Sequence, residues 1–143
     1  MADIEIRSAV VEDAPVLSDL CRQLGYERSP AAIERWITGA GEPDVAFVAV
    51  VDGQVAGWVQ AHDVELLVYP RFLEIGGLVV ADHVRRSGIG RALMDAAVAW
   101  GGKRGHTEVR LRSNVVRHDA HAFYKSLGFE SNKTSYTFTM DIR

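Results

Sequence analysis

Two hydrophobic periods follow one another along the first forty residues. Residues 4–7 (Ile-Glu-Ile-Arg) alternate between apolar and polar and predict a first strand. Residues 12–24 carry apolar side chains at helical spacing, and Gly25 follows where a helix would end. Ser29 and Pro30 place a cap and a first-turn proline before a second helix, which ends near Gly39. The N-terminal part is therefore expected to form a strand and two helices.

Strand signals dominate the middle of the chain and alternate with helices after it. Residues 45–51 and 55–61 predict two strands joined by Asp52-Gly53, which is a strong hairpin signal. The elements expected next are a strand at 72–80, a helix at 88–103, a strand at 108–112, a helix at 119–127 and a last alternating strand at 135–141. The order βααβββαβαβ predicts one mixed α/β domain over residues 1–143 with one main central sheet.

Composition and charge narrow the classes of function. The 143 residues hold 16 Lys and Arg against 19 Asp and Glu, so no broad basic surface for nucleic acid is expected. No apolar run reaches the roughly 18 residues of a membrane span, and the acidic N-terminus is not that of a signal peptide. The one cysteine, Cys21, excludes an internal disulfide and a thiolate zinc cage. We expect a cytoplasmic protein without nucleic-acid or membrane partners.

Residues 78–91 are the most informative stretch of the chain. They combine a buried strand, a loop with Arg85 and Arg86, and a helix start at Gly88-Ile89-Gly90. The free N–H groups and positive dipole of a helix start, with nearby arginines, suit a phosphate or pyrophosphate. The alternative is a tight strand-to-helix turn whose glycines only satisfy backbone geometry. A dinucleotide fingerprint is weaker, because Leu93 stands where it needs glycine or alanine.

Three segments together resemble a known family. Arg85-Arg86-Ser87-Gly88-Ile89-Gly90 is similar to the R/Q-x-x-G-x-G/A signature of the GNAT superfamily of N-acetyltransferases. The resemblance extends back to the Leu-x-Val of residues 78–80 and forward to residues 120–129, which resemble the family's A-x-x-F-Y-x-x-x-G-F helix and strand. It implies a GNAT-like mixed central sheet of about six to seven strands flanked by about four helices.

The resemblance also implies acetyl-CoA as cosubstrate. Its pyrophosphate would lie in the loop at 86–91, and its pantetheine arm in a split between the strands that end near Val80 and Ser113. Many members place an asparagine three residues before the helix alanine, where this chain has Arg117, so Asn114 is a candidate contact or a plain turn residue. The expected cofactor-binding residues are Leu78, Val79, Val80, Arg85, Arg86, Ser87, Gly88, Ile89, Gly90, Arg91, Asn114 and Phe123.

Glu74 is the candidate general base. It lies in a strand that is apolar on both faces, where a carboxylate is costly unless it is paired or faces a water-filled cleft. Gly76, two residues on, is expected to leave room beside it for substrate or water. Some members of the family place their catalytic Glu or His at the matching position. The alternative is a structural salt bridge to Arg71 or Arg110.

Tyr124 is the candidate general acid, because a phenol can protonate a departing thiolate. The resemblance assigns this role to the tyrosine of the Phe-Tyr pair, whereas the amphipathic helix alone favours a core tyrosine with a bonded hydroxyl. His118 and His121 lie one helical turn apart without a third ligand at useful spacing, so no metal is expected.

The resemblance implies an acceptor pocket built from the first two helices and the segment before the Glu74 strand. These supply an aromatic and acidic set that suits a cationic amine, or else core and solvated surface: Tyr26, Trp36, Asp63, Glu65 and Tyr69. The chain is thus expected to be an N-acetyltransferase that acts by direct transfer on a small-molecule or peptide amine. The alternatives are a non-catalytic acyl-CoA-binding module and a nucleotide-binding regulatory domain. Many members of the family are homodimers, so a homodimer is a hypothesis for this chain, although the sequence shows no interface.

Overall fold

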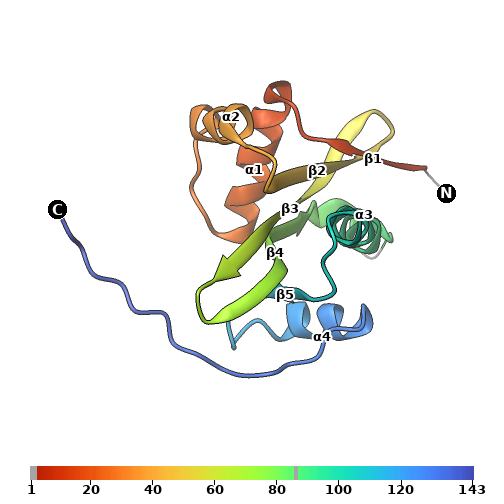
Figure 1. Cartoon of the computed structure of the whole chain (residues 1–143). Helices are drawn as coiled ribbons and strands as arrows, with labels where there is room; N and C mark the ends of the chain where they lie inside the picture. Colours follow the sequence, from red (N-terminus) through yellow and green to blue (C-terminus); the bar gives the residue numbers. More distant parts are fainter. Residues whose placement is uncertain (1–2, 86) are drawn as a thin grey trace. The chain divides into compact units, whose positions relative to one another are not determined.

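The computed structural model describes residues 3–85 and 87–143. It divides the chain into two compact units, Met1–Leu111 and Arg112–Arg143, which are treated separately below. The first unit contains β1 (Ile4–Ser8), a 3-10 turn (Val11–Asp13), α1 (Ala14–Leu24), α2 (Pro30–Gly39), β2 (Asp44–Val51), β3 (Gln54–Leu66), β4 (Tyr69–Val80), a second 3-10 turn (Asp82–Val84), α3 (Ile89–Lys103) and β5 (Val109–Leu111) (Figure 1). The second contains α4 (His118–Ser126). The expectation of a single domain over residues 1–143 stays a prediction.

The sheet of the first unit has the order β1-β2-β3-β4-β5. β1 to β4 pair antiparallel with their neighbours, while β4 and β5 run parallel, so the sheet is mixed as expected. The described residues form five strands, fewer than the six to seven expected. The missing strand at 135–141 accounts for one of them, as described below.

The helix ends and the first hairpin form where the sequence places them. Gly25 ends α1 in the left-handed conformation, at φ 104°. The Ser29 hydroxyl accepts a hydrogen bond from the Ala32 N–H at 3.1 Å, which caps α2 in front of its first-turn proline. Asp52 and Gly53 have φ values of 51° and 77°, as a tight turn between β2 and β3 requires. These local predictions are confirmed.

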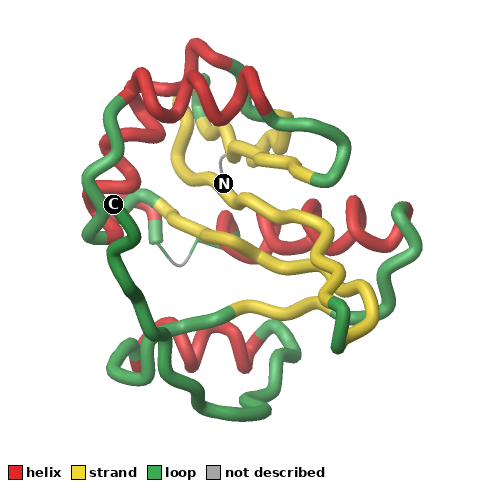
Figure 2. The backbone as a smooth tube through the Cα atoms, turned by 60° about the vertical axis from the view of Figure 1, so that its left-hand side comes forward, coloured by secondary structure: helices red, strands yellow, loops and turns green. Residues whose placement is uncertain are grey.

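Helices cover both faces of the sheet. On one face, Leu17 and Leu20 of α1 and Ile33 of α2 pack with Val48 and Val79 of the sheet. On the other face lie Ile89 and Leu93 of α3, so close to Gly57 that a Cβ there would lie 3.4 and 3.1 Å from them. α1 and α2 run together on one side of the strands and α3 on the other (Figures 1 and 2). Glu74 therefore lies in a strand covered on both faces, as expected.

The second unit consists of α4 and a long extended tail. Gly128 follows α4 with φ 102°, where the sequence places a helix stop. Residues 130–143 form neither helix nor strand, and the tube of this tail is drawn as loop in Figure 2. The expected strand at 135–141 is therefore wrong for the chain alone. The alternation is present, but a strand also needs a neighbouring backbone, and the described part of the chain supplies none.

Candidate active site

The parallel strands β4 and β5 pair over three residues only. Their register runs from Leu73 opposite Val109 to Ile75 opposite Leu111, and β4 then continues to Val80 with β3 as its strand neighbour. The Ala81 N–H donates to the Ala56 carbonyl at 2.8 Å, on the β3 side. Because backbone groups alternate along a strand, those of Leu78 and Val80 point to the opposite side, beyond the end of β5. β4 thus runs on past the end of β5 at Leu111, and the expected split between the two strands stays a prediction.

At this edge of β4, the Val80 carbonyl is already hydrogen-bonded and the Val79 side chain is buried. The Val80 carbonyl accepts a hydrogen bond from the Gln23 amide at 2.7 Å, and the same amide accepts from the Asp82 N–H at 2.9 Å. This ties the end of β4 to α1. The Val79 side chain is buried in the core, so a ligand at this edge would meet backbone rather than this side chain.

The loop between β4 and α3 ends at an open helix start. Gly88 has φ +87° and is the residue before α3, where no side chain caps the helix. The first-turn N–H groups of Ile89, Gly90 and Arg91 therefore point out of the helix start, as an anion site requires. The Ile89 side chain is buried in the core, so only its backbone could face a ligand.

The loop's own side chains contribute less than expected. Arg85 forms an exposed ion pair with Asp82 at 2.8 Å, and the Ser87 hydroxyl donates to the Val84 carbonyl. Arg86, also expected to bind the cofactor, lies outside the described residues. Arg91, in the first turn of α3, adds a positive charge to that of the helix start.

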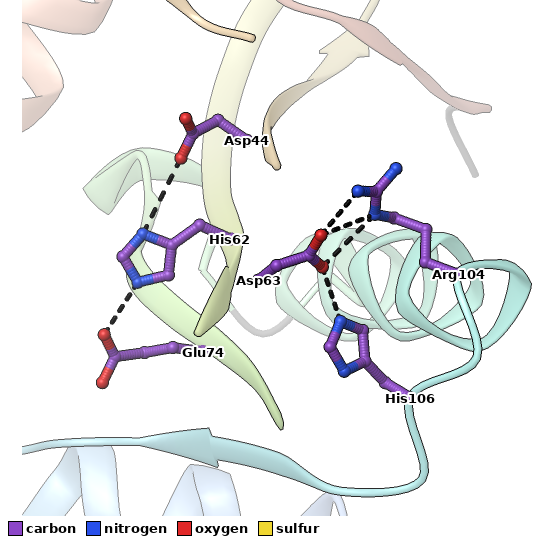
Figure 3. Close-up of polar contacts among 6 residues, drawn as sticks. All are labelled: Asp44, His62, Asp63, Glu74, Arg104 and His106. Atoms are coloured by element: carbon purple, nitrogen blue, oxygen red, sulfur yellow. Dashed lines mark hydrogen bonds and ion pairs between the residues drawn. The ribbon is translucent and has the colours of Figure 1, made fainter. Parts of the chain in front are cut away.

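Glu74 faces a histidine that the sequence analysis did not single out. Nε2 of His62, on β3, lies 2.8 Å from Oε1 of Glu74, and Nδ1 of His62 lies 3.7 Å from Oδ1 of Asp44 on β2. Figure 3 shows the three side chains in a row across neighbouring strands. The Glu74 side chain is 16% exposed, so it is largely but not wholly withdrawn from water.

The two arginines offered as structural partners of Glu74 have contacts of their own. Arg71 lies 3.7 Å from Asp63, and Arg110 forms an ion pair with Glu108. The room expected beside Gly76 is filled, because a Cβ at Gly76 would lie 1.8 Å from the Gln60 side-chain oxygen. Gly76 is thus explained by the Gln60 amide that packs over it, and the expectation of substrate room there is wrong.

Asp63 forms a second, tighter cluster. Its carboxylate accepts hydrogen bonds from Arg104 at 2.5 and 3.1 Å and from His106 Nε2 at 2.5 Å (Figure 3). Hydrogen bonds from Arg104, opposed by burial and assisted by His106, lower the pKa of Asp63 from 3.8 to about 2. Nδ1 of His106 is buried without a partner, which favours the tautomer that donates from Nε2 to Asp63. Asp63 therefore holds β3 to the end of α3 and is not available to an amine.

Trp36 lines a pocket together with Asp44. The pocket has a volume of about 160 Å³ and lies between α2, the end of β1 and the start of β2. Its lining is Ser8, Ala9, Trp36, Ile37, Ala40, Asp44, Val45 and Ala46. Asp44 thus lies both on this pocket and in the row that leads through His62 to Glu74.

The other residues expected at the acceptor side are spread out. The Arg110 guanidinium lies 3.8 Å above the Tyr69 ring, so one face of this ring already holds a cation. Tyr26 is exposed between α1 and α2, and Glu65 is exposed near the end of β3. Trp36 is the member of the set that lines a hollow.

Tyr124 and its neighbours belong to the second unit. Burial raises the pKa of Tyr124, while the charge of Arg117 lowers it to a smaller extent. The ring lies 5.6 Å from that of Phe123 and 6.0 Å from that of Phe129. The expected meeting of Tyr124 with Glu74 stays a prediction.

Asn114 is built into the turn before α4. Its side-chain oxygen accepts from the Val116 N–H at 3.1 Å, and its carbonyl accepts from the Arg117 N–H and the His121 ring. This geometry favours the turn residue over the cofactor contact.

No three His, Cys, Asp or Glu side chains in the described part of the chain gather closely enough to hold a metal ion. No helix there is long and apolar enough to cross a membrane.

Comparison with known proteins settles the family. Residues 13–129 match the sequence model of the acetyltransferase (GNAT) family. The chain belongs to this family. The resemblance read from the three motifs of this GNAT chain is thereby confirmed.

The relatives of this GNAT chain include enzymes of different size. N-acetyltransferase family 8 member 3 of Mus musculus is 30% identical over 99 residues, which are 68% of this chain and 44% of the relative, so the chain spans under half of that protein. The aminoalkylphosphonate N-acetyltransferase of Salmonella typhimurium is 28% identical over 93% of this chain and 89% of the relative. The solved aminoglycoside N-acetyltransferase AAC(6')-Iy in complex with CoA has a TM-score of 0.86 at 18% identity, over 98% of this chain and 96% of that chain, which shows the fold.

Proposed function

We propose that this GNAT chain transfers the acetyl group of acetyl-CoA directly to a primary amine while both substrates are bound. The observation that carries the proposal is the edge of β4 at Leu78 and Val80, which runs on past its pairing with β5 and is followed within ten residues by the uncapped start of α3. The edge offers backbone hydrogen bonds to an extended amide-containing arm, and the helix start offers N–H groups to a pyrophosphate. The described residues thus fit acetyl-CoA, which supplies the activated thioester.

Glu74 acts as the base that removes a proton from the acceptor amine. An alkylammonium with a pKa near 10 is deprotonated in about one molecule in a thousand at pH 7, which costs roughly 4 kcal/mol without a base. Glu74 accepts this proton, directly or through water, and the freed amine forms the new C–N bond as the C–S bond breaks. His62 is the positioning residue: its hydrogen bond to Glu74 fixes the carboxylate, and Asp44 lies on the other side of its ring.

Tyr124 completes the proton balance by donating to the departing thiolate. Burial raises its pKa, so its phenol is protonated at neutral pH and ready to donate. The second proton of the attacking nitrogen leaves as the amide forms and restores Tyr124, while Glu74 releases its proton to solvent, so both groups are ready for the next cycle.

The acceptor is proposed to be a small cationic amine. The pocket beside Trp36 and Asp44 combines an aromatic ring and a carboxylate, which both attract a cation, and it leads to the row that ends at Glu74. The names of the aminoalkylphosphonate and aminoglycoside N-acetyltransferases above support an amine of this size.

The test is a steady-state assay of thiol release with acetyl-CoA and a panel of amines. Glu74→Gln is expected to lower kcat by about 10²–10⁴-fold with acetyl-CoA affinity nearly unchanged, because general-base assistance is lost while the cofactor edge is kept. His62→Ala should lower kcat less, and His62→Gln, which can still donate to Glu74, should restore part of it. Asp95→Asn, on the exposed side of α3, is the matched control. Wild-type turnover in Glu74→Gln would overturn the assignment, and binding without turnover for every amine would favour an acyl-CoA-binding module.

A further inference from the structure

The Gln23 side chain joins two parts of the chain that the proposed cofactor site uses separately. Gln23 lies near the end of α1, and its amide N–H donates to the Val80 carbonyl at 2.7 Å, while its amide oxygen accepts from the Asp82 N–H at 2.9 Å. Val80 is the last residue of β4, and Asp82 is the first residue of the 3-10 turn that leads toward α3. One uncharged side chain therefore bridges the end of the strand edge and the start of the loop before the helix.

The two hydrogen bonds lie on the side of β4 that faces away from β3. The Ala81 N–H, between them in sequence, donates to the Ala56 carbonyl of β3, and Ala81 is still extended, with φ −56° and ψ 136°. Because backbone groups alternate along an extended chain, the Val80 carbonyl and the Asp82 N–H point the other way. The Gln23 amide thus supplies the donor and the acceptor that a neighbouring strand would supply at this edge.

The end of α1 also holds this stretch by apolar contacts. Ala81 is 5% exposed, and it belongs with Val84 and with Leu24 of α1 to one apolar cluster. Four residues after Val84 the chain reaches Gly88, which precedes the open start of α3. The end of α1 therefore fixes how the loop leaves β4, and Gln23 supplies the polar part of this contact.

The bridge matters because a single cofactor molecule touches both sides of it. In the proposed site, the amide-containing arm pairs with the β4 edge and the pyrophosphate binds at the start of α3. A ligand that makes two contacts gains the second one at little cost only where the two contact points already have the spacing that the ligand spans. The backbone from Val80 to the start of α3 sets this spacing, and Gln23 is bonded to its first residues.

We propose that Gln23 is a positioning residue for acetyl-CoA. Its amide holds the β4 edge and the loop before α3 at the spacing that one cofactor molecule spans. Because Gln23 already donates to the Val80 carbonyl, the arm of the cofactor pairs with the Val80 N–H and with Leu78 instead. The inference rests on the proposed function, since it takes the β4 edge and the helix start as one site for acetyl-CoA.

The first test compares the whole cofactor with its two halves on the wild type and on Gln23→Met. Methionine has about the length of glutamine but lacks the amide, so the Kd of acetyl-CoA is expected to rise about tenfold in titration calorimetry. The halves are the nucleotide diphosphate part of CoA and S-acetylpantetheine, followed by NMR titration. Each should bind within about twofold of its wild-type affinity, because each half of the site is intact.

The matched control is Gln54→Met, which makes the same change at an exposed position of β3 and should bind all three ligands like the wild type. Far-UV circular dichroism checks that both variants are folded. An unchanged acetyl-CoA affinity in Gln23→Met would overturn the inference. So would an equal loss for all three ligands, because it would mean damage to each half of the site rather than a lost spacing.

Failure of the proposed function has a different signature. A wild type that does not bind acetyl-CoA would overturn both the proposed function and the inference. A wild type that binds acetyl-CoA but acetylates no amine would overturn only the transfer step, while the comparison of whole and divided cofactor still decides the role of Gln23.

The second test uses the unmodified chain and so does not depend on how the variants fold. If the Gln23 contact strengthens acetyl-CoA binding, acetyl-CoA must strengthen the contact by the same factor. Hydrogen exchange of the Asp82 amide, measured by NMR, should therefore slow about tenfold with saturating acetyl-CoA and by less than about twofold with either half. Unchanged exchange, or faster exchange because the cofactor displaces Gln23, would overturn the inference.

Discussion

The Asp63 cluster allows the sharpest quantitative prediction about stability. Asp63 is 13% exposed and accepts hydrogen bonds from Arg104 and His106, which lower its pKa from 3.8 to about 2. A difference of nearly two pKa values corresponds to about 2 kcal/mol of folding free energy at neutral pH. Asp63→Asn removes the charge and turns an amide N–H toward these donors, so it is expected to cost at least about 2 kcal/mol at pH 7.

The pH dependence of this loss follows from the sign of the shift. The folded pKa lies below the unfolded one, so the contribution is complete above about pH 5 and is lost as the pH falls through 3.8 toward the folded value. The charge-dependent part of the difference between wild type and Asp63→Asn should shrink to about 0.4 kcal/mol at pH 2.

Urea unfolding at pH 7 and at intervals down to pH 2 measures this difference. Asp95→Asn is the matched control, because the same change on the exposed face of α3 should stay within about 0.5 kcal/mol of wild type. An Asp63→Asn protein as stable as wild type at pH 7 would refute the reasoning. So would a loss of the same size at every pH.

Two further predictions concern packing and the proton donor. Gly57→Ala should destabilise the protein by about 1–3 kcal/mol in urea unfolding, because the added Cβ would lie 2.7 Å from the Val79 carbonyl oxygen. Gly102→Ala, in α3 with nothing within 4 Å of the new Cβ, should instead stabilise it by up to about 1 kcal/mol, and the reverse order would contradict the packing described. Tyr124→Phe should lower kcat for acetyl transfer by about 100-fold or more with acetyl-CoA affinity within about twofold, and unchanged turnover would remove Tyr124 from the proton balance.

Local chemistry made much of the fold predictable. The caps of α1 and α2, the Asp52-Gly53 turn and the helix that starts after Gly88 depend on neighbouring residues, so the sequence alone locates them. The end of the pairing between β4 and β5 at Leu111 could not be predicted in this way, since no local pattern states where two parallel strands cease to pair.

The row of polar side chains formed by Asp44, His62 and Glu74 could not be predicted from the sequence. His62 meets Glu74 because β3 runs on to Leu66, beyond the residue-61 limit expected for that strand. An irregularity between Gln60 and Ala61 then sets which residues of β4 lie opposite. The available signal was the alternation of polar and apolar positions after residue 61, but register across a sheet depends on turns and bulges as well.

Contacts between residues far apart in the chain could not be predicted from the sequence either. Asp63 and Arg104 are 41 positions apart, and their meeting requires both the sheet and α3 to be in place. The tail at 135–141 illustrates the opposite case, in which the local pattern of a strand is present but no strand of the described residues pairs with it.

Thermal unfolding with and without acetyl-CoA tests the central claim most directly. A ligand at about a hundred times its Kd adds roughly 2.7 kcal/mol of stability, which should raise the Tm by about 5–15 °C for a chain of this length. Acetyl-CoA is expected to give this rise, while ATP and NAD at the same concentration do not. Gly88→Ala, which strains the left-handed residue before α3, should reduce the rise. No rise with saturating acetyl-CoA, or an equal rise with ATP, would contradict the account.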